Sequence, residues 1–187
     1  MIEKGTYYKF GNKKVFVSFK KDVYENLYLQ AIIDSYQNID KTAGLENEIR
    51  DRIVWDLQNN NPLTTGLFQT EILDIIFERY NFLNPTEKSR VDICFHWSDF
   101  GKFEIECKRL FQQPSKNEAY LNDGLIRFIE LKYAEKNDYG GMLGFVVSGN
   151  IETIRDKVFN ETKTFYSGVS PYNINFLTGN IVLFRII

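Results

Sequence analysis

The sequence predicts an α/β domain in which helices flank a central mixed β-sheet. Segments with apolar–polar alternation, typical of strands, are interspersed along the chain with segments of helical apolar spacing. The clearest two strands are joined by a tight turn that contains glycine, which favours a hairpin. The 187 residues, of which 43% are hydrophobic and 16% aromatic, suit a single domain with a buried core, residues 1–187.

Composition limits the classes of function. The net charge is −2 and the pI is about 5.6, whereas a self-sufficient nucleic-acid-binding domain usually has a pI above ~9. This charge balance argues against a protein that coats DNA, but it allows a catalytic domain with a small local groove, helped by a homodimer or a partner protein. No apolar run reaches the ~18 residues that span a bilayer. The first residues lack the apolar core of a signal peptide, so we expect a cytoplasmic protein with no membrane partner.

The cysteines and the histidine exclude several kinds of site. Cys94 and Cys107 form neither a disulfide framework nor a CxxC pair. Both lie in strand-like segments, so we expect buried thiols. His96 is the single histidine, which excludes a site built from several histidines. A position on a sheet face is a simpler interpretation of His96 than a catalytic role.

The first part of the chain contains two predicted helices and one ambiguous segment. A short strand at Val15–Phe19 precedes a helix from about Asp22 to Asn38, which carries apolar residues at helical spacing. A second helix runs from Leu45 to about Gln58. By period, the stretch Thr70–Tyr80 fits a buried strand and a helix equally well, and its β-branched residues favour a strand.

The clearest pattern is a β-hairpin between residues 91 and 108. Odd-numbered residues are apolar on both sides of the turn Ser98–Gly101, and they alternate with the even-numbered ones. The even-numbered residues are Asp92, Cys94 and His96 before the turn, and Lys102, Glu104, Glu106 and Lys108 after it. A three-residue loop with Gly101 in the left-handed conformation places all of these side chains on one face.

This loop also predicts the register of the two strands. Closing it at Ser98 sets Asp92 opposite Lys108, within cross-strand reach. Cys94 then lies opposite Glu106. A two-residue turn would shift the register by one and turn Asp92 towards the apolar face. Taken alone, this alternation is also typical of the solvated face of a half-buried hairpin.

The remainder of the chain alternates between helix and strand. Ser115 and Glu118 form an S-x-x-E capping box at the start of a helix that extends to about Lys136. The elements that follow are a break at Gly140–Gly141, a strand from Met142 to Ser148, a helix capped by Asn150 that ends at about Thr162, and a strand from Ile181 to Ile187.

One acidic residue lies on the core-facing side of the second helix. Glu46 points within the apolar stripe formed by Leu45, Ile49, Ile53 and Leu57, whereas Glu48 projects outside it. Carboxylates are seldom buried unpaired. The helix dipole favours an acid in the first turn, but it does not explain the direction in which Glu46 points.

Asp92, the tripeptide Glu106-Cys107-Lys108 and the upstream Glu46 resemble the PD-(D/E)XK nuclease superfamily, which includes restriction endonucleases. The resemblance implies a restriction endonuclease-like fold with an αβββαβ core, here about residues 45–149, with an N-terminal strand–helix addition and a C-terminal helix–strand addition. The segment Tyr120-x-x-x-Gly124-x-x-Arg127-Phe128, with Tyr133, resembles the helix after the motif in several restriction-like families. The segment Arg90-Val91-Asp92 lacks the proline of the motif.

The resemblance implies a metal-dependent endonuclease that hydrolyses phosphodiester bonds, with DNA as the expected substrate. Asp92 and Glu106 would bind Mg²⁺ or Mn²⁺ together with the backbone carbonyl of Cys107, and Glu46 would bind it directly or through water. The metal would activate a water molecule. Lys108 would orient that water and offset the developing negative charge.

Several alternatives stay open. Arg127 is a candidate for contacting a phosphate, but Asp123 and Glu130 lie at helical spacing around it and favour a surface ion-pair ladder. Glu104 is either an accessory metal ligand or a solvated residue. The chain could also be a ribonuclease, or a non-catalytic protein-interaction module that keeps a nuclease-like fold, which the acidic pI and the aromatic content favour.

Overall fold

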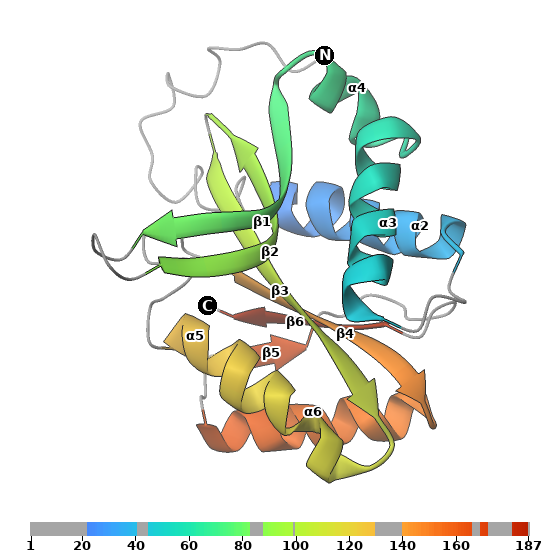
Figure 1. Cartoon of the computed structure of the whole chain (residues 1–187), viewed down its shortest axis with the longest axis vertical. Coiled ribbons are helices and arrows are strands. Elements are labelled where there is room, and N and C mark those ends of the chain that lie inside the picture. Colours follow the sequence, from blue (N-terminus) through green and yellow to red (C-terminus); the bar gives the residue numbers. More distant parts are fainter. Residues whose placement is uncertain are drawn as a thin grey trace.

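The structure is a computed structural model, and it describes residues 22–40, 45–82, 88–98, 100–129, 140–165, 169–171 and 181–186. In these ranges helices pack on both sides of one β-sheet (Figure 1). The predicted α/β class, with a mixed sheet flanked by helices, is confirmed. The predicted strand Val15–Phe19 lies outside the described residues.

The N-terminal helices form one of the two covering layers. The first predicted helix is present as the π-helix η2 (Tyr24–Leu29) and the α-helix α2 (Gln30–Asn38). The second is α3 (Glu46–Asn59), and the short helix α4 (Thr65–Gln69) follows it. Both predicted helices are therefore confirmed. α3 buries Ile49, Ile53 and Leu57 as expected, whereas Leu45 precedes the helix and is exposed.

The sheet has six strands in the order β1-β2-β3-β4-β6-β5. Their bounds are β1 Leu73–Phe82, β2 Lys88–Trp97, β3 Gly101–Phe111, β4 Gly140–Ser148, β5 Val169–Pro171 and β6 Ile181–Ile186. β3 and β4 are parallel and the other neighbouring pairs are antiparallel, so the sheet is mixed. The ambiguous segment Thr70–Tyr80 thus contains a strand, as its β-branched residues indicated.

The hairpin of β2 and β3 has the predicted faces but a different register. The strands close on Trp97 and Gly101, and Gly101 has the expected left-handed backbone with φ of 79°. Cys94 consequently pairs with Glu104, so the predicted pairing with Glu106 is wrong by two residues. The turn closes one residue earlier on β2 and one residue earlier on β3 than predicted. Because the shift is even, the side chains keep their predicted faces.

The central part of the even-numbered face of the hairpin is buried, so its interpretation as a solvated face is wrong there, whereas His96 and Lys102 near the turn are partly exposed. Cys94, Glu104 and Glu106 are all nearly inaccessible to water. The reason is that a second helical layer covers this side of the sheet. That layer consists of the π-helix η4 (Tyr120–Leu125), α5 (Ile126–Ile129) and α6 (Ile151–Phe165), whose apolar residues pack against Met142 and Val146 of β4.

The segment after the hairpin differs from the single helix predicted there. Its described part consists of a 3₁₀ turn at Pro114–Asn117, then η4 and α5. Ser115 lies inside the 3₁₀ turn and Gln113 occupies the N-cap position, so the capping box at Ser115 is wrong. Residues 130–139 lie outside the described ranges.

The glycines after this segment begin β4 instead of standing before it. A Cβ at Gly140 would lie 2.5 Å from a ring carbon of Phe128, which explains why this position carries no side chain. The predicted cap of α6 is confirmed, since Asn150 Oδ1 accepts a hydrogen bond from Thr153 N at 2.9 Å. Among the described residues, no helix is both long and apolar enough to cross a membrane.

Candidate active site

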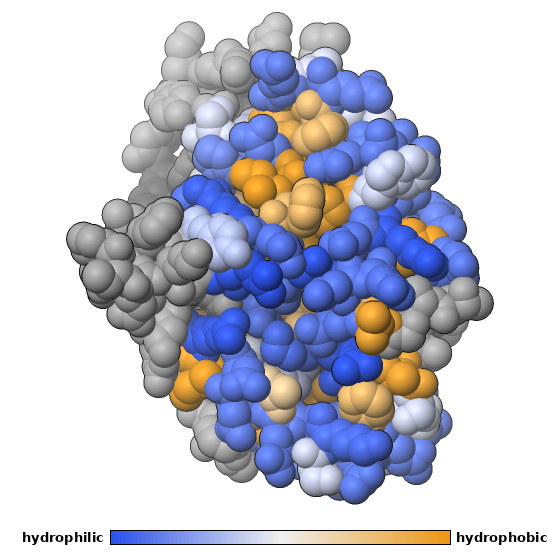
Figure 2. Space-filling view, viewed as in Figure 1, coloured by the Kyte–Doolittle hydropathy of each residue, from blue (hydrophilic) through white to orange (hydrophobic). Residues whose placement is uncertain are grey.

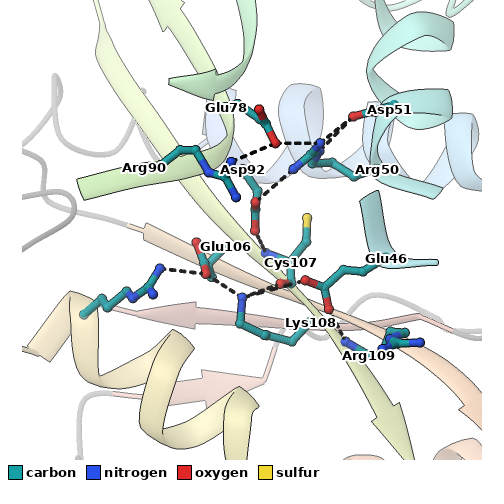
Figure 3. Close-up of polar contacts among 11 residues, drawn as sticks. Glu46, Arg50, Asp51, Glu78, Arg90, Asp92, Glu106, Cys107, Lys108 and Arg109 are labelled. Atoms are coloured by element: carbon teal, nitrogen blue, oxygen red, sulfur yellow. Dashed lines mark hydrogen bonds and ion pairs between the residues drawn. The ribbon is translucent and has the colours of Figure 1, made fainter. Parts of the chain in front are cut away.

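The candidate site forms where β2 separates from β3. The ladder between these strands ends at the pair Ile93 and Ile105. Two backbone N–H groups of β3 beyond that point are bonded by side chains instead: Cys107 N donates to Asp92 Oδ2 at 2.7 Å, and Arg109 N donates to Glu46 Oε2 at 2.9 Å (Figure 3). A buried N–H needs an acceptor. The end of the ladder thus fixes one carboxylate from β2 and one from α3 beside β3.

Glu106 and Lys108 lie next to these two acids. Lys108 Nζ donates to Glu106 Oε1 at 2.6 Å and to the carbonyl oxygen of Cys107 at 2.9 Å. The same ammonium lies 3.8 Å from Glu46 Oε1. The other oxygen of Glu106, Oε2, is buried and has no hydrogen-bond partner among the described residues. A buried acceptor without a partner is costly, and such an atom calls for a functional or structural explanation.

The charges of the site follow from burial and crowding. Burial, and then the negative charge of Asp92, raise the pKa of Glu106 to about 7, against the opposing effect of Lys108. Burial acts to lower the pKa of Lys108, but the carboxylates around it outweigh burial and raise that pKa. Lys108 therefore stays charged at neutral pH, whereas the pKa of Glu106 lies close to neutral pH. Burial also raises the pKa of Glu46.

Arg127 joins the site from α5. Its Nη1 lies 3.2 Å from Glu106 Oε1, and its side chain is 38% exposed. Arg127 thus contacts Glu106, an acid of the site. Glu106 was not among the partners predicted from helical spacing, which were Asp123 and Glu130. Glu130, one of the two predicted partners, lies outside the described residues.

Arg50 is a component of the site that the sequence interpretation missed. It lies one turn after Glu46 on α3, and its guanidinium contacts Asp92 Oδ1 at 3.2 Å and Glu78 Oε1 at 3.1 Å. It also contacts the exposed Asp51 at 2.7 Å. The available signal was the helical spacing, because a residue four positions after Glu46 lies on the same face of the helix.

The structure brings all of the predicted site residues into one network and separates others from it. Glu46, Asp92, Glu106, Cys107, Lys108 and Arg127 are joined by direct contacts. Glu48 is exposed, which identifies Glu46 as the helix-borne acid. Glu104 is buried, so the solvated alternative for it is wrong.

The remaining candidates do not provide a nucleophile. His96 contacts Asp74 of β1 at 3.4 Å and belongs to the outer part of the hairpin. Cys94 and Cys107 are buried as predicted. Burial raises the pKa of Cys94 to about 11 and raises that of Cys107 as well, so both thiols stay protonated at neutral pH.

The donor atoms suit a hard cation held by few protein ligands. The oxygens of Glu106 and Cys107 already converge on one positive group, the ammonium of Lys108, and Glu106 Oε2 has no partner in the part of the chain that the structure describes. Mg²⁺ prefers such oxygen ligands and keeps several waters. Within the described ranges, no group of three or more His, Cys, Asp or Glu side chains is arranged to hold a metal. Because Lys108 Nζ already bonds to Glu106 Oε1 and to the carbonyl of Cys107, binding of a cation by these two oxygens would require Lys108 to move away from them.

Comparison of the chain with protein families, with curated proteins and with solved structures gives no match.

Proposed function

We propose that this protein is a Mg²⁺-dependent nuclease of the restriction endonuclease-like fold, which hydrolyses phosphodiester bonds of DNA. The observation that carries this proposal is the convergence of Glu46, Asp92, Glu106 and Lys108 at the point where β2 leaves β3. The elements α3, β1, β2, β3, η4–α5 and β4 follow the αβββαβ order that the resemblance implies.

Each side chain of the site would have a separate role in hydrolysis. Asp92, Glu106 and the carbonyl of Cys107 would hold the cation, which when bound supplies Lewis-acid activation of the phosphate and of water. Lys108, whose side chain is 15% exposed, would turn from Glu106 towards the attacking water and the developing charge. Glu46, held by Arg109 N, would bind a water of the cation.

Substrate binding would rely on local positive charge, since the chain as a whole has a net charge of −2. Arg127, half-exposed beside Glu106, is the candidate for contacting a phosphate oxygen. In Figure 2 hydrophilic residues form a band across the middle of the molecule, with hydrophobic residues above and below it. A partner protein or a second copy of the chain would supply further contacts to DNA.

The test is cleavage of supercoiled plasmid DNA, single-stranded DNA and RNA with Mg²⁺ or Mn²⁺. The key variant is Lys108→Met, which keeps most of the side-chain length and removes the charge. Lys102→Met is the matched control, because Lys102 lies on the same face of β3 near the turn and away from the network. We expect Lys108→Met to lose at least about 100-fold in rate, since removal of one group that stabilises developing charge typically costs 10²–10³-fold.

The substrates separate the classes of nuclease. Cleavage of RNA alone would replace the DNA assignment with a ribonuclease. Equal inactivity of the wild-type protein and Lys108→Met on every substrate would overturn the enzymatic proposal.

A non-catalytic interaction module is the second candidate, and one observation favours it. Asp92 and Glu46 each bond a β3 N–H group, and Asp92 is also paired with Arg50, so these acids already have structural roles. Trp55 and Phe77 are more than half exposed and could contribute to an interface. Calorimetric titration with Mn²⁺ separates the two candidates, because only the nuclease should bind Mn²⁺ in a manner that Asp92→Asn and Glu106→Gln abolish.

A further inference from the structure

Arg50 is the most buried cation of the site. Its side chain is 3% exposed, and its guanidinium faces three carboxylates, of which Asp92 is 10%, Glu78 30% and Asp51 54% exposed. A buried charge persists only where it is paired and hydrogen-bonded. The innermost of the three partners, Asp92, is the one that bonds to Cys107 N.

The backbone around this pair is unusual. Glu78 has a left-handed φ of 50°, which a residue other than glycine rarely adopts. The register of β1 and β2 passes from Phe77 and Ile93 to Arg79 and Val91 without a pair between Glu78 and Asp92. Asp92 thus lies at an interruption of both ladders of β2, because the ladder to β3 ends at Ile93. Strain of this kind persists only where the surrounding structure enforces it.

Two arginines hold the side chain of Glu78 at this point. Glu78 Oε1 is held between Arg50 Nη2 at 3.1 Å and Arg90 Nη1 at 3.1 Å. Arg50 uses its other terminal nitrogen, Nη1, for Asp92 Oδ1. A guanidinium is planar and presents its donors in a fixed fork, so its two terminal nitrogens define the relative positions of two carboxylates, which a single ammonium cannot do.

We propose that Arg50 is a positioning residue that holds Asp92 in the orientation in which one carboxylate oxygen bonds to Cys107 N, and that it thereby sets the affinity of the site for a divalent cation. Arg50 acts through Asp92 and does not touch the substrate. The part of this inference that concerns the cation rests on the proposed function, whereas the part that concerns the orientation of Asp92 does not.

Two effects of Arg50 on cation binding have opposite signs and can be separated. Its positive charge alone would weaken the binding of a cation nearby, whereas the orientation that it imposes on Asp92 would strengthen it. Arg50→Lys keeps the charge and loses the fork, so it tests the orientation. Arg50→Gln also loses the charge. If only charge mattered, Arg50→Lys would bind like the wild-type protein and Arg50→Gln would bind more tightly.

Hydrogen exchange of two backbone amides on β3 tests the orientation without any metal. Cys107 N donates to Asp92, and Arg109 N donates to Glu46, so the two amides report on neighbouring carboxylates. In Arg50→Lys we expect the exchange of the Cys107 amide to accelerate about tenfold, the loss of roughly one hydrogen bond. The Arg109 amide should be unchanged. No change, or equal acceleration of both amides, would overturn the proposal, because a general loss of stability affects both.

Two further variants complete this test. Asp51→Ala is the control, because it removes the exposed partner of the same guanidinium and should leave the Cys107 amide protected. If Arg50→Lys does not fold, Arg50→Gln provides the test, since it also lacks the guanidinium fork that contacts both Asp92 and Glu78. Unchanged protection of Cys107 in Arg50→Gln would then overturn the proposal.

Calorimetric titration with Mn²⁺ tests the effect on the cation. Substitution of a residue that orients a metal ligand typically lowers metal affinity by 10–100-fold, so we expect about a tenfold loss in Arg50→Lys and none in Asp51→Ala. Equal affinity of Arg50→Lys and the wild-type protein would refute the role in cation binding. A wild-type protein that binds no Mn²⁺ would instead refute the proposed nuclease, while the exchange of the Cys107 amide would still decide the orientation.

Discussion

The buried carboxyl group of Glu106 makes the stability of the metal-free protein depend on pH. Burial and the charge of Asp92 raise its pKa from 4.5 to about 7. An acid with a raised pKa binds its proton more tightly in the folded state than in the unfolded chain, so ionisation of Glu106 destabilises the fold. This cost is absent below pH 4.5 and fully present above about pH 7.

The size of the effect follows from that difference in pKa. Each pH unit corresponds to about 1.4 kcal/mol, so the free energy of unfolding should lose roughly 3 kcal/mol through Glu106 as the pH rises across this interval. Glu106→Gln fills nearly the same volume and cannot ionise. Its free energy of unfolding should therefore increase relative to that of the wild-type protein by roughly 3 kcal/mol over the same interval. Lys108 would keep an acidic neighbour in the variant, because Glu46 Oε1 lies 3.8 Å from its ammonium in the wild-type protein.

The assay is urea unfolding in the presence of EDTA, at several pH values from about 4.5 to about 8. Glu48→Gln on the exposed side of α3 is the control for the loss of one carboxyl group. A difference between the wild-type protein and Glu106→Gln that stays constant over this range would refute the reasoning. So would a difference that changes in favour of the wild-type protein as the pH rises.

Two further predictions concern stability and are measured by urea or thermal unfolding. Asn61→Ala should cost roughly 3 kcal/mol, because buried Asn61 donates hydrogen bonds to two groups of α2 and accepts one from a backbone N–H of the α3–α4 turn. The control Asn59→Ala, at an exposed position, should cost less than about 1 kcal/mol. Equal losses of stability in the two variants would contradict this prediction. Gly140→Ala should cost about 1–3 kcal/mol through its clash with the ring of Phe128. Gly66→Ala in α4 should instead stabilise by about 0.5–1 kcal/mol, because the new Cβ meets no atom of the described residues within 4 Å. A neutral Gly140→Ala would show that the ring moves freely.

Local patterns in the sequence predicted the elements that carry the site. The alternation on both sides of the turn placed Asp92, Glu106 and Lys108 on one face, and the apolar stripe of the second helix placed Glu46 towards the core. Each inference depended on side-chain period, which is a property of the backbone geometry. The proposed chemistry stays a prediction, which the cleavage assays test.

The register of the β2–β3 hairpin and the role of Arg50 were harder to predict. Loops of equal length close on Trp97 and Gly101 or on Ser98 and Lys102 with the same alternation, so the pattern could not choose between registers two residues apart. The role of Arg50 was not predicted because it depends on contacts with Glu78 and Asp92, which lie 28 and 42 residues after Arg50 in the chain. Its residue type alone is typical of a helix surface.

The sequence by itself determined the order of the longer helices and strands and the faces of the hairpin, since periodicity follows from a few neighbouring residues. The short elements α4 and β5 were not predicted. The tertiary structure alone decided that η4 and α5 lie against Glu106 and that β2 leaves β3 at Asp92. Those features depend on the packing of elements distant in the chain. The acids are consequently buried. Burial raises the pKa of Glu106, and the buried carboxylates are paired with Arg50 and Lys108.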